Sequence, residues 1–403
     1  MSAPWLTIVG IGEDGVPGLT ATAQAAVREA DLVVGGTRHL SLADELIQGE
    51  RMAWPHPIEA AFPALLARRF RPVAVLGSGD PYCFGIGSVL ARHVAATETR
   101  CLPAPSAFSL ACGRLGWAMQ DCATISFCGR PLAALVPLLY PGARILALSN
   151  DATTPHVIAA LLRSRGFGPS RLHVLEALGG PRERMRVAPA AEFALEEVQA
   201  LNMLAIEVAA GPDAYAIPLA SGLPDVRFEH DGQMTKQEVR AITLSALAPQ
   251  RGELLWDIGC GSGSIGIEWL LRHPANRVVA VEERPDRAER AVRNATELGV
   301  PHFGIVVGRA PGVLASLERP AAMFIGGGAH EAGVIDTAWA ALPRNGRLVA
   351  NAVTVETEAA LLAARTRLGG TLTRIGIARL DSIGDLHGYR PAMTVTQWLA
   401  VKP

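Results

Sequence analysis

The sequence predicts an α/β protein with two domains, and three observations lead to this prediction. The chain has 403 residues, more than one ordinary core supports, so two domains of roughly 200 residues each are expected. Apolar strand-like runs alternate with helical patterns in both halves. Two separate glycine-rich turns follow such runs, at 77–81 and 257–263.

Composition narrows the class of protein. The formal net charge is −1, and although only two of the 37 basic residues are lysine, acidic residues balance them. Since no polybasic tail is present, we expect no nucleic-acid or membrane partner. The chain starts without a charged leader, and no apolar run approaches roughly 18 residues, so we expect a soluble, cytoplasmic enzyme.

The six cysteines predict neither a metal site nor disulfides. They show no Cys-x-x-Cys spacing and no tight His/Cys cluster. We therefore expect reduced, mostly buried thiols and no bound metal. The cysteines are Cys83, Cys101, Cys112, Cys122, Cys128 and Cys260.

A βαβ unit is expected at the start of the first domain. The sequence predicts a buried strand at Trp5–Gly10, an alanine-rich helix at Leu19–Ala30 and a strand at Leu32–Gly35. Breaker residues crowd 210–228, so we expect a linker there, between domains at 1–209 and 229–403. Further strands of the first domain are expected at Val73–Gly77, Arg144–Ser149, Leu172–Leu175 and Met203–Val208.

The second domain opens with Thr235 and Glu238, whose spacing fits a capping box before a helix that runs to about Leu247. Regular alternation of strands and helices then predicts a doubly wound, mostly parallel sheet. The tail reads as two strands without a helix, Thr371–Leu380 and Ala392–Val401, as at an antiparallel sheet edge. The parallel strands are expected at Glu253–Ile258, Arg277–Glu282, Phe303–Val307, Ala322–Ile325 and Arg347–Asn351.

The turn after Asp257 has the spacing Gly259-x-Gly261-x-Gly263, which lets the backbone approach a ligand at the carboxyl end of a strand. Glu282 ends the next strand and can accept the ribose hydroxyls of an adenosine. The spacing favours S-adenosylmethionine over NAD, whose fingerprint is Gly-x-Gly-x-x-Gly, although Gly266 lies close by. The alternative is that these glycines only relieve strain in a turn.

The earlier turn, Gly77-Ser78-Gly79-Asp80-Pro81, exposes backbone polar groups and one carboxylate after an apolar strand. Taken alone, such a turn is more often structural than functional. Its significance depends on the motifs around it.

The second half resembles the precorrin decarboxylating methyltransferases, over about 222–403. The resemblance implies that Thr235, Gly259, Cys260, Gly261, Ser262, Gly263, Glu282 and Ala310 line a site for S-adenosylmethionine. Thr235 also has the alternative interpretation of a helix cap, and Arg309 stands where the family often has an acid. The motifs that carry the resemblance are Met234-Thr235-Lys236, 257–263, Gly308-Arg309-Ala310-Pro311, Phe324-Ile325-Gly326-Gly327 and 351–357.

The first half resembles the tetrapyrrole methylases, over about 1–208. The motifs are Val9-Gly10-Ile11-Gly12, 35–40, 77–81, 126–130 and 176–181. The resemblance implies a two-lobed α/β fold with S-adenosylmethionine in the cleft between the lobes. Cys128 stands where relatives commonly have histidine. The cofactor contacts implied are Gly10, Gly77, Ser78, Gly79, Asp80, Ser106, Ala107 and Gly129.

Both resemblances together are those of the fused precorrin-6Y methyltransferases of cobalamin biosynthesis. They imply methylation of macrocycle carbon 5 by the first half, and methylation of carbon 15 with loss of a ring acetate as carbon dioxide by the second. They also imply a tetrapyrrole substrate, one S-adenosylmethionine per domain and a homo-oligomer. The conjugated macrocycle supplies the electron sink for decarboxylation, so no metal is required.

Substrate-side residues are open between two interpretations, and we identify no catalytic acid or base. Arg38 and Arg130 can hold substrate carboxylates by bidentate hydrogen bonds, or can be ordinary surface residues. Asn351, Thr354 and Glu356 follow a strand's carboxyl end, where ligands bind, although Glu356 also suits the start of a helix. For His39 a structural role is the more ordinary expectation.

Two competing functions remain at the level of sequence. One is a tetrapyrrole-binding carrier in which only one methyltransferase domain is active, although both glycine turns are intact. The other is an NAD-dependent oxidoreductase in the second half, which the glycine spacing disfavours.

Overall fold

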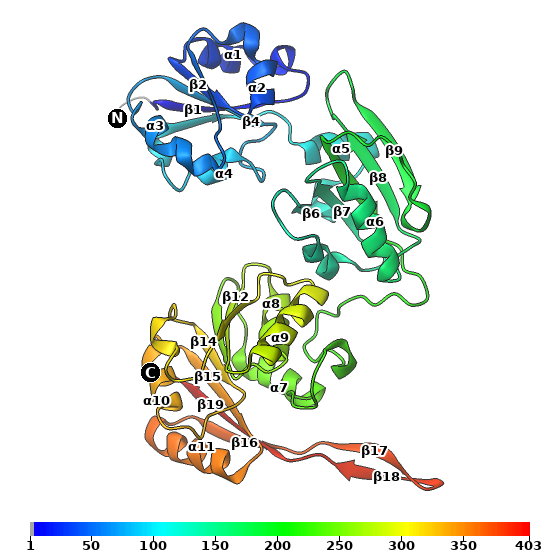
Figure 1. Ribbon diagram of the computed structural model, residues 1–403, viewed down its shortest axis with the longest axis vertical. Coiled ribbons are helices and arrows are strands. Elements are labelled where there is room, and N and C mark those ends of the chain that lie inside the picture. The colour runs from blue at the N-terminus through cyan, green and yellow to red at the C-terminus, as the bar shows by residue number, and fades with distance from the viewer. Residues whose placement is uncertain (1–3) are drawn as a thin grey trace. The chain divides into compact units, whose positions relative to one another are not determined.

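The computed structural model describes residues 4–403, which form two compact units (Figure 1). The first unit comprises Met1–Leu132 and Leu138–Tyr215, and the second comprises Ala133–Pro137 and Ala216–Pro403. Each unit has its own sheets and its own buried core. They are therefore described one at a time.

The first unit begins with a parallel five-stranded sheet in the order β3-β2-β4-β1-β5. Its strands are β1 (Leu6–Ile11), β2 (Leu32–Gly35), β3 (Glu50–Ala53), β4 (Val73–Ser78) and β5 (Thr99–Leu102). The βαβ unit expected at the chain start is present, with α1 at Ala21–Arg28. This helix begins later than expected because the Thr20 side chain accepts a hydrogen bond from the Ala23 amide and caps it. The other helices here are α2 (Thr37–Leu42), α3 (Phe62–Leu66) and α4 (Ile86–Leu90).

A mixed sheet in the order β6-β7-β10-β8-β9 forms the second half of this unit. Only β6 and β7 run parallel, and the remaining pairs are antiparallel. The strands are β6 (Cys122–Ser126), β7 (Arg144–Leu148), β8 (Arg171–Glu176), β9 (Arg184–Pro189) and β10 (Asn202–Glu207), with helices α5 (Ala107–Leu115) and α6 (Thr154–Ser164). The two-sheet α/β architecture agrees with the fold class expected for the first half.

The second unit is built on a seven-stranded sheet in the order β13-β12-β11-β14-β15-β19-β16. Its first five strands are parallel, which confirms the doubly wound prediction. They are β11 (Leu254–Ile258), β12 (Arg277–Glu282), β13 (Gly304–Val307), β14 (Ala322–Ile325) and β15 (Arg347–Ala352). Because parallel strands share one carboxyl edge, the ends of β11, β12, β14 and β15 lie together.

Helices cover this sheet, and apolar residues fill the space between the layers. One buried cluster contains Trp269, Leu244 and Phe324, and another contains Trp256, Met323 and Leu361. The helices are α7 (Gln237–Leu247), α8 (Ser264–Arg272), α9 (Pro285–Glu297), α10 (Val334–Ala341) and α11 (Val355–Leu368).

The tail of the chain is only partly as expected. Strands β16 (Thr371–Ile375) and β19 (Val395–Val401) do form the antiparallel edge of the sheet. The prediction that one strand runs through to Leu380 was wrong, because the chain leaves the sheet after Ile375. Residues 378–391 instead form a separate hairpin, β17 (Ala378–Ile383) and β18 (Leu386–Pro391), which projects as an arm (Figure 1).

Two further expectations are corrected. Helix α7 has Lys236, not Thr235, as its N-cap residue, and no side chain caps it. The capping box fails because the Glu238 carboxylate pairs with Arg379 instead of reaching back to the helix start. All six cysteines are free, but only Cys112 and Cys260 are buried, and Cys128 is exposed.

Residues 222–228, within the range expected to be a linker, pack against the second unit through a buried ion pair. The side chains of Arg240 and Glu268 are both fully buried and bonded at 2.6 Å. Glu268 also accepts hydrogen bonds from the Gly222 and Leu223 amides, at 2.7 and 2.9 Å. Arg240 donates to the carbonyls of Leu223 and Thr235. The guanidinium of Arg240 in α7, together with Glu268 in α8, thus ties the start of this segment to both helices.

Within residues 4–403, no helix is both long and apolar enough to cross a membrane. The same residues contain no cluster of three or more His, Cys, Asp or Glu side chains arranged to hold a metal ion.

We predict that Arg240→Met destabilises the second unit by about 3–5 kcal/mol, because it removes the ion-pair partner of the fully buried Glu268 side chain. The control is Arg277→Met, which breaks the exposed Arg277–Glu318 pair and should cost no more than about 1 kcal/mol. Urea unfolding followed by tryptophan fluorescence measures both. Equal effects of the two substitutions would contradict the anchoring role of Arg240.

Candidate functional site

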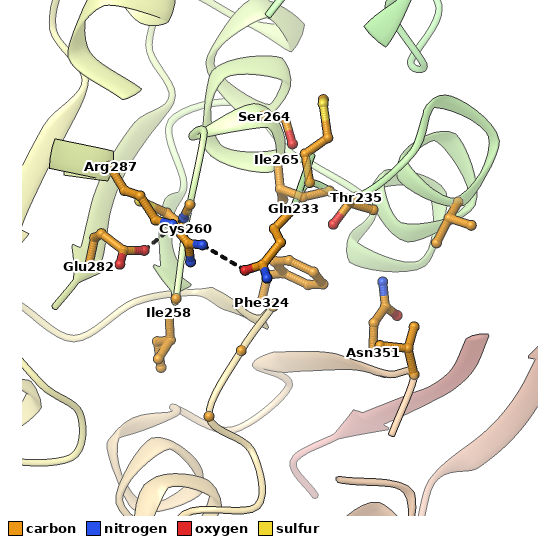
Figure 2. A pocket seen from close by; sticks show the side chains of 18 of the residues that line it. Gln233, Thr235, Ile258, Cys260, Ser264, Ile265, Glu282, Arg287, Phe324 and Asn351 are labelled. Carbon is orange, nitrogen blue, oxygen red and sulfur yellow. Dashed lines mark hydrogen bonds between the residues drawn. The ribbon is translucent and has the colours of Figure 1, made fainter. Parts of the chain in front are cut away.

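A pocket of about 740 Å³ opens at the carboxyl edge of the parallel strands in the second unit. Residues from the ends of β11, β12, β14 and β15 line it, together with the segment before α7. Open α/β sheets bind ligands at this edge. In Figure 2, Glu282 and Asn351 stand at opposite ends of the pocket, with Thr235 and Phe324 between them.

The glycine turn after β11 forms one side of the pocket. Gly259, Gly261 and Gly263 all have positive φ, at 69°, 57° and 77°. A Cβ on Gly259 would lie 2.9 Å from the Gly327 amide nitrogen, on the loop after β14. Glycine is required there by both the left-handed backbone and the close approach of two loops.

Two carboxylates at the ends of neighbouring strands hold this turn. Asp257, which is 1% exposed, accepts the Gly266 amide at 2.9 Å, and Glu282 accepts the Gly261 amide at 2.9 Å. Burial raises the pKa of Asp257 to about 7, the Gly266 hydrogen bond opposes this shift, and the charge of Glu282 adds to it. Asp257 therefore carries a proton through much of the acidic range.

The site fits the adenosine part of S-adenosylmethionine. The two oxygens of Glu282 accept the Gly261 and Arg284 amides, at 2.9 and 3.1 Å. Each carboxylate oxygen has a second lone pair, which leaves acceptor capacity for ribose hydroxyl donors. The bare backbone at Gly259 and Gly261 leaves room for close ligand approach.

The structure brings most of the residues expected in the second half to this pocket. Thr235, Gly259, Cys260, Gly261, Glu282, Ala310 and Asn351 line it. Gly263 and Ser262 do not, and Ser262 is buried behind the turn, where its carbonyl accepts the Asn294 side chain at 2.9 Å.

Thr354 and Glu356 are also outside the lining. Thr354 is the N-cap of α11, and its hydroxyl accepts the Thr357 amide at 3.3 Å. Glu356 lies in the first turn of this helix, where an acid favours the dipole. Their substrate-binding role stays a prediction, while the helix-start interpretation has direct contacts in its support.

Sequence reasoning missed several side chains that line this pocket, among them Arg287 and Gln233. Arg287 of α9 donates to the Gln233 amide oxygen at 2.6 Å (Figure 2). It also donates to Asp231 at 2.9 Å. This pair closes the cofactor side of the pocket. Arginine is the usual basic residue of this chain, so the type of residue at 287 gave no signal. Arg309, noted as a departure from the family, lines the pocket and pairs with Glu331 at 2.7 Å.

Asn351 is held by a buried polar network. Its Nδ2 donates to Thr243 Oγ1 at 2.9 Å, and its Oδ1 accepts from Gln397 Nε2 at 3.0 Å. Gln397 also donates to Thr243, which donates to the Val239 carbonyl. The amide is thereby fixed in orientation, with one Nδ2 hydrogen not used by this network.

In the first unit, the two glycine segments meet at the ends of neighbouring strands. Gly10 of β1 pairs in register with Gly77 of β4, and the Gly79 amide donates to Ile11 at 3.1 Å. A Cβ on Gly10 would lie 1.8 Å from the Gly79 carbonyl oxygen, and one on Gly79 would lie 2.6 Å from the Pro105 oxygen. Gly10, Gly77, Gly79 and the Ser106 backbone are therefore brought together.

Ser78 joins Arg38 to this turn. The Ser78 hydroxyl lies 2.8 Å from both Arg38 Nη2 and His39 Nε2, and Arg38 also pairs with Glu13. Burial lowers the pKa of His39 to about 4, and the charge of Arg38 adds to this effect. His39 is therefore neutral at physiological pH, and both side chains contact the turn instead of lying at an ordinary surface.

The remaining first-half candidates have local partners. Asp80 accepts the Tyr82 amide at 2.9 Å, which is a turn contact. Ser106 caps α5, whose first residue is Ala107. Gly129 has a φ of 64°, and its amide donates to Asn150 at 3.4 Å. The Arg130 guanidinium stacks 5.1 Å from the centre of the Phe84 ring.

Comparison with known families assigns both halves of the chain. A family model described as the precorrin methyltransferase domain matches residues 226–402. A model described as tetrapyrrole (corrin/porphyrin) methylases matches residues 5–194.

Individual relatives agree with this assignment. A Sinorhizobium protein named precorrin-6Y C(5,15)-methyltransferase [decarboxylating] is 56% identical over 396 residues, covering 98% of this chain and 96% of that protein. A Saccharolobus solfataricus protein named probable cobalt-precorrin-6B C(15)-methyltransferase (decarboxylating) is 36% identical, covering 44% and 98%. A Salmonella typhimurium protein named cobalt-precorrin-7 C(5)-methyltransferase is 32% identical, covering 46% and 90%.

We predict that Gly259→Ala weakens S-adenosylmethionine binding by at least about tenfold, because the added Cβ pushes the turn away from Gly327. The control is Gly252→Ala, which also has a positive φ, of 81°, but whose Cβ would meet nothing within 4 Å. Both variants carry a similar backbone penalty of about 1–2 kcal/mol for alanine in the left-handed region. Isothermal titration should show weakened binding only for Gly259→Ala, and normal binding by that variant would contradict the role of the close approach.

We predict that Asp257 makes the second unit less stable as pH rises from about 4 to about 7. The folded state keeps the Asp257 proton over this range while the unfolded state loses it. The contribution of Asp257 to the free energy of unfolding therefore falls by up to about 4 kcal/mol. Asp257→Asn should remove this slope, since an amide does not titrate. Urea unfolding of both proteins at several pH values measures the difference, and parallel curves would contradict the prediction.

Proposed function

The chain belongs to the family of decarboxylating precorrin-6Y C(5,15)-methyltransferases, and on that premise we propose that it methylates carbons 5 and 15 of a precorrin and decarboxylates a ring acetate. The methyl donor proposed is S-adenosylmethionine, one molecule per domain. The observation that carries the proposal is the pocket of the second unit, where the glycine turn meets Gly327 and Glu282 keeps free acceptor capacity.

Methyl transfer from S-adenosylmethionine requires mainly that the enzyme position its two reactants. When bound, S-adenosylmethionine supplies an electrophilic methyl group on a positively charged sulfur. The protein's residues hold the donor and the nucleophilic bridge carbon in line, which by itself lowers the barrier substantially. In the second unit, Glu282 and the Gly259–Gly261 backbone hold the cofactor end, and Asn351 offers an N–H at the opposite end.

Decarboxylation breaks the bond between the acetate methylene and its carboxyl carbon. The electron pair enters the conjugated macrocycle, carbon dioxide leaves, and a proton is later taken up at carbon. Since the substrate itself accepts the electrons, the protein has to orient the acetate and exclude water. We assign no residue as acid or base.

We assign carbon 5 to the first domain, at 1–209, and carbon 15 with decarboxylation to the second, at 229–403. Two observations support this division. The shorter relatives named for carbon 15 and carbon 5 each cover less than half of this chain and nearly all of their own length. In the first unit, the meeting of Gly10, Gly77 and Gly79 supports a cofactor site there, with Arg38 held on Ser78.

We also propose that the enzyme self-associates and works in the cytoplasm, as its resemblance implies. The arm formed by β17 and β18 exposes Leu380, Ile383, Leu386 and Tyr389, each at least 60% accessible, which supports an interface there. Light scattering during gel filtration tests the oligomeric state.

A carrier with one active domain is the second candidate. Its support is the exposed Cys128, which stands at a position where first-half relatives commonly have histidine. It predicts that only one of the two methyl groups is transferred.

The test is a mass spectrum of precorrin-6Y after incubation with S-adenosylmethionine and the full chain. We expect a gain of two methyl groups and loss of one carbon dioxide. At limiting S-adenosylmethionine, Gly259→Ala should strongly reduce the methylation assigned to the second site, because it weakens cofactor binding there. Gly79→Ala should abolish only the other methylation, since its Cβ would clash with Pro105.

Gly252→Ala serves as the control and should give the wild-type product. A single methyl gain from the wild-type chain would favour the carrier function. An unchanged macrocycle, with active control enzymes, would overturn the methyltransferase proposal.

A further inference from the structure

The pocket of the second unit has a wall far from the glycine turn, built by the start of α7 and the base of the β17–β18 hairpin. Lys236, Val239, Ile377, Arg379 and Val395 line the pocket here. In the sheet order, β19 lies three strands from β11, which at strand spacing is roughly 15 Å. The β19 side of this wall therefore lies away from the glycine turn, and we call the whole surface the distal wall.

The distal wall has an apolar floor. Val239, Ile375 and Val395 are each 7–8% exposed and form a small cluster against which Ile377 packs. The cluster is separate from the two main cores of the unit. A partly open apolar surface inside a pocket suits the flat face of a conjugated ring system.

Two cations stand on this wall. Within residues 4–403, the Lys236 ammonium has no hydrogen bond or ion pair, although it is half-buried and lines the pocket. The other lysine of the chain, Lys402, donates to the carbonyls of Trp339, Ala340 and Leu342, which is a structural role. An ammonium has three donors, so all three of Lys236 remain for a ligand.

Arg379 is fixed by an ion pair that occupies only part of its guanidinium group. Its Nε and Nη2 bond both oxygens of Glu238, and this bond keeps the pKa of Glu238 below its usual range, so the carboxylate is charged. In the described part of the chain, Nη1 has no partner, which leaves a pair of N–H donors. Glu238 cancels one of the two positive charges on the wall, and Lys236 leaves an excess of one.

We propose that the distal wall is a binding site for two peripheral carboxylates of the tetrapyrrole, one on the Lys236 ammonium and one on Arg379 Nη1, with the macrocycle face on Val239, Ile377 and Val395. This inference rests on the function proposed above and names the residues that recognise its substrate. An ammonium or guanidinium bound to a carboxylate forms a strong, charge-assisted hydrogen bond. The hairpin base thereby becomes part of the substrate site.

The test uses the full chain with Lys236→Met, Arg379→Gln and the double variant, assayed with precorrin-6Y. We expect each single substitution to raise KM for the tetrapyrrole by about 10- to 100-fold, because each removes a hydrogen bond to a charged group. The Kd for S-adenosylmethionine should stay within about twofold. Added salt should raise KM more steeply for the wild type than for the double variant, which has lost the charges that salt screens.

The matched control is Arg374→Gln. Arg374 lies on β16 of the same sheet edge and forms an exposed ion pair with Glu358, but it is outside the pocket lining. Its loss should leave KM unchanged. A second control is the methyl ester of the tetrapyrrole, whose binding should be weak with the wild type and no weaker with Lys236→Met.

The outcomes separate the two proposals. Wild-type KM in the Lys236 and Arg379 variants, with normal methylation, would overturn the distal-wall inference and leave the proposed function standing. An equal loss of S-adenosylmethionine affinity in Lys236→Met would overturn it too, because Lys236 would then belong to the cofactor end. Failure of the wild-type chain to bind S-adenosylmethionine at all would overturn the proposed function itself.

Discussion

The site of the second unit depends on two buried carboxylates, each holding backbone of the turn that follows β11. Asp257 fixes the Gly266 amide at the start of α8, and Glu282 fixes the Gly261 amide from the neighbouring strand. Between Asp257 and Gly266 the chain passes through three left-handed glycines and approaches the next loop at Gly327. Hydrogen bonds to carboxyl groups at two strand ends thus set the shape of the loop. The raised pKa of Asp257 is the cost of placing its charge away from water.

The first unit also brings two glycine-containing backbone segments into close contact at the ends of its strands, although its sheet is different. Gly10 and Gly79 let two backbone segments touch at the ends of β1 and β4, as Gly259 and Gly327 do after β11 and β14. Here the charged groups are different, since Arg38 and neutral His39 reach the Ser78 hydroxyl and no acid ends the strand. What the two turns share is close backbone approach, which requires glycine whatever the surrounding topology.

Sequence patterns predicted best where burial decides the structure. The strands Arg277–Glu282 and Ala322–Ile325 were predicted to the residue, because both faces are covered and clear signals bound the runs. Charged residues bound the first strand, and Pro320 and Gly326 bound the second. The hairpin at 378–391 was missed because nearly all of its residues are exposed. Neither strand has a buried face, so the sequence lacks the alternation of apolar and polar residues that predicts a strand. The capping box at Thr235 failed because Glu238 has a partner 141 residues away, in Arg379. Arg287, Gln233 and the Thr243–Gln397 network were invisible for the same reason, since each depends on contacts distant in sequence.

The charges along the pocket run from acidic to basic, and this order suits the two proposed ligands. At the cofactor end, three carboxylates outnumber two guanidinium groups, and on the distal wall two cations outnumber one carboxylate. The cofactor end has Glu282, Glu283 and Glu331 with Arg287 and Arg309, and the distal wall has Lys236 and Arg379 with Glu238. The acidic cofactor end attracts a sulfonium donor, and the basic distal wall attracts a macrocycle that carries carboxylates. Binding of the two ligands in exchanged positions is therefore disfavoured at both ends of the pocket. Methyl transfer removes the positive charge from sulfur. The acidic end of the pocket therefore attracts the demethylated cofactor less strongly than it attracts S-adenosylmethionine. This electrostatic difference acts over separations within the Debye length of roughly 8 Å.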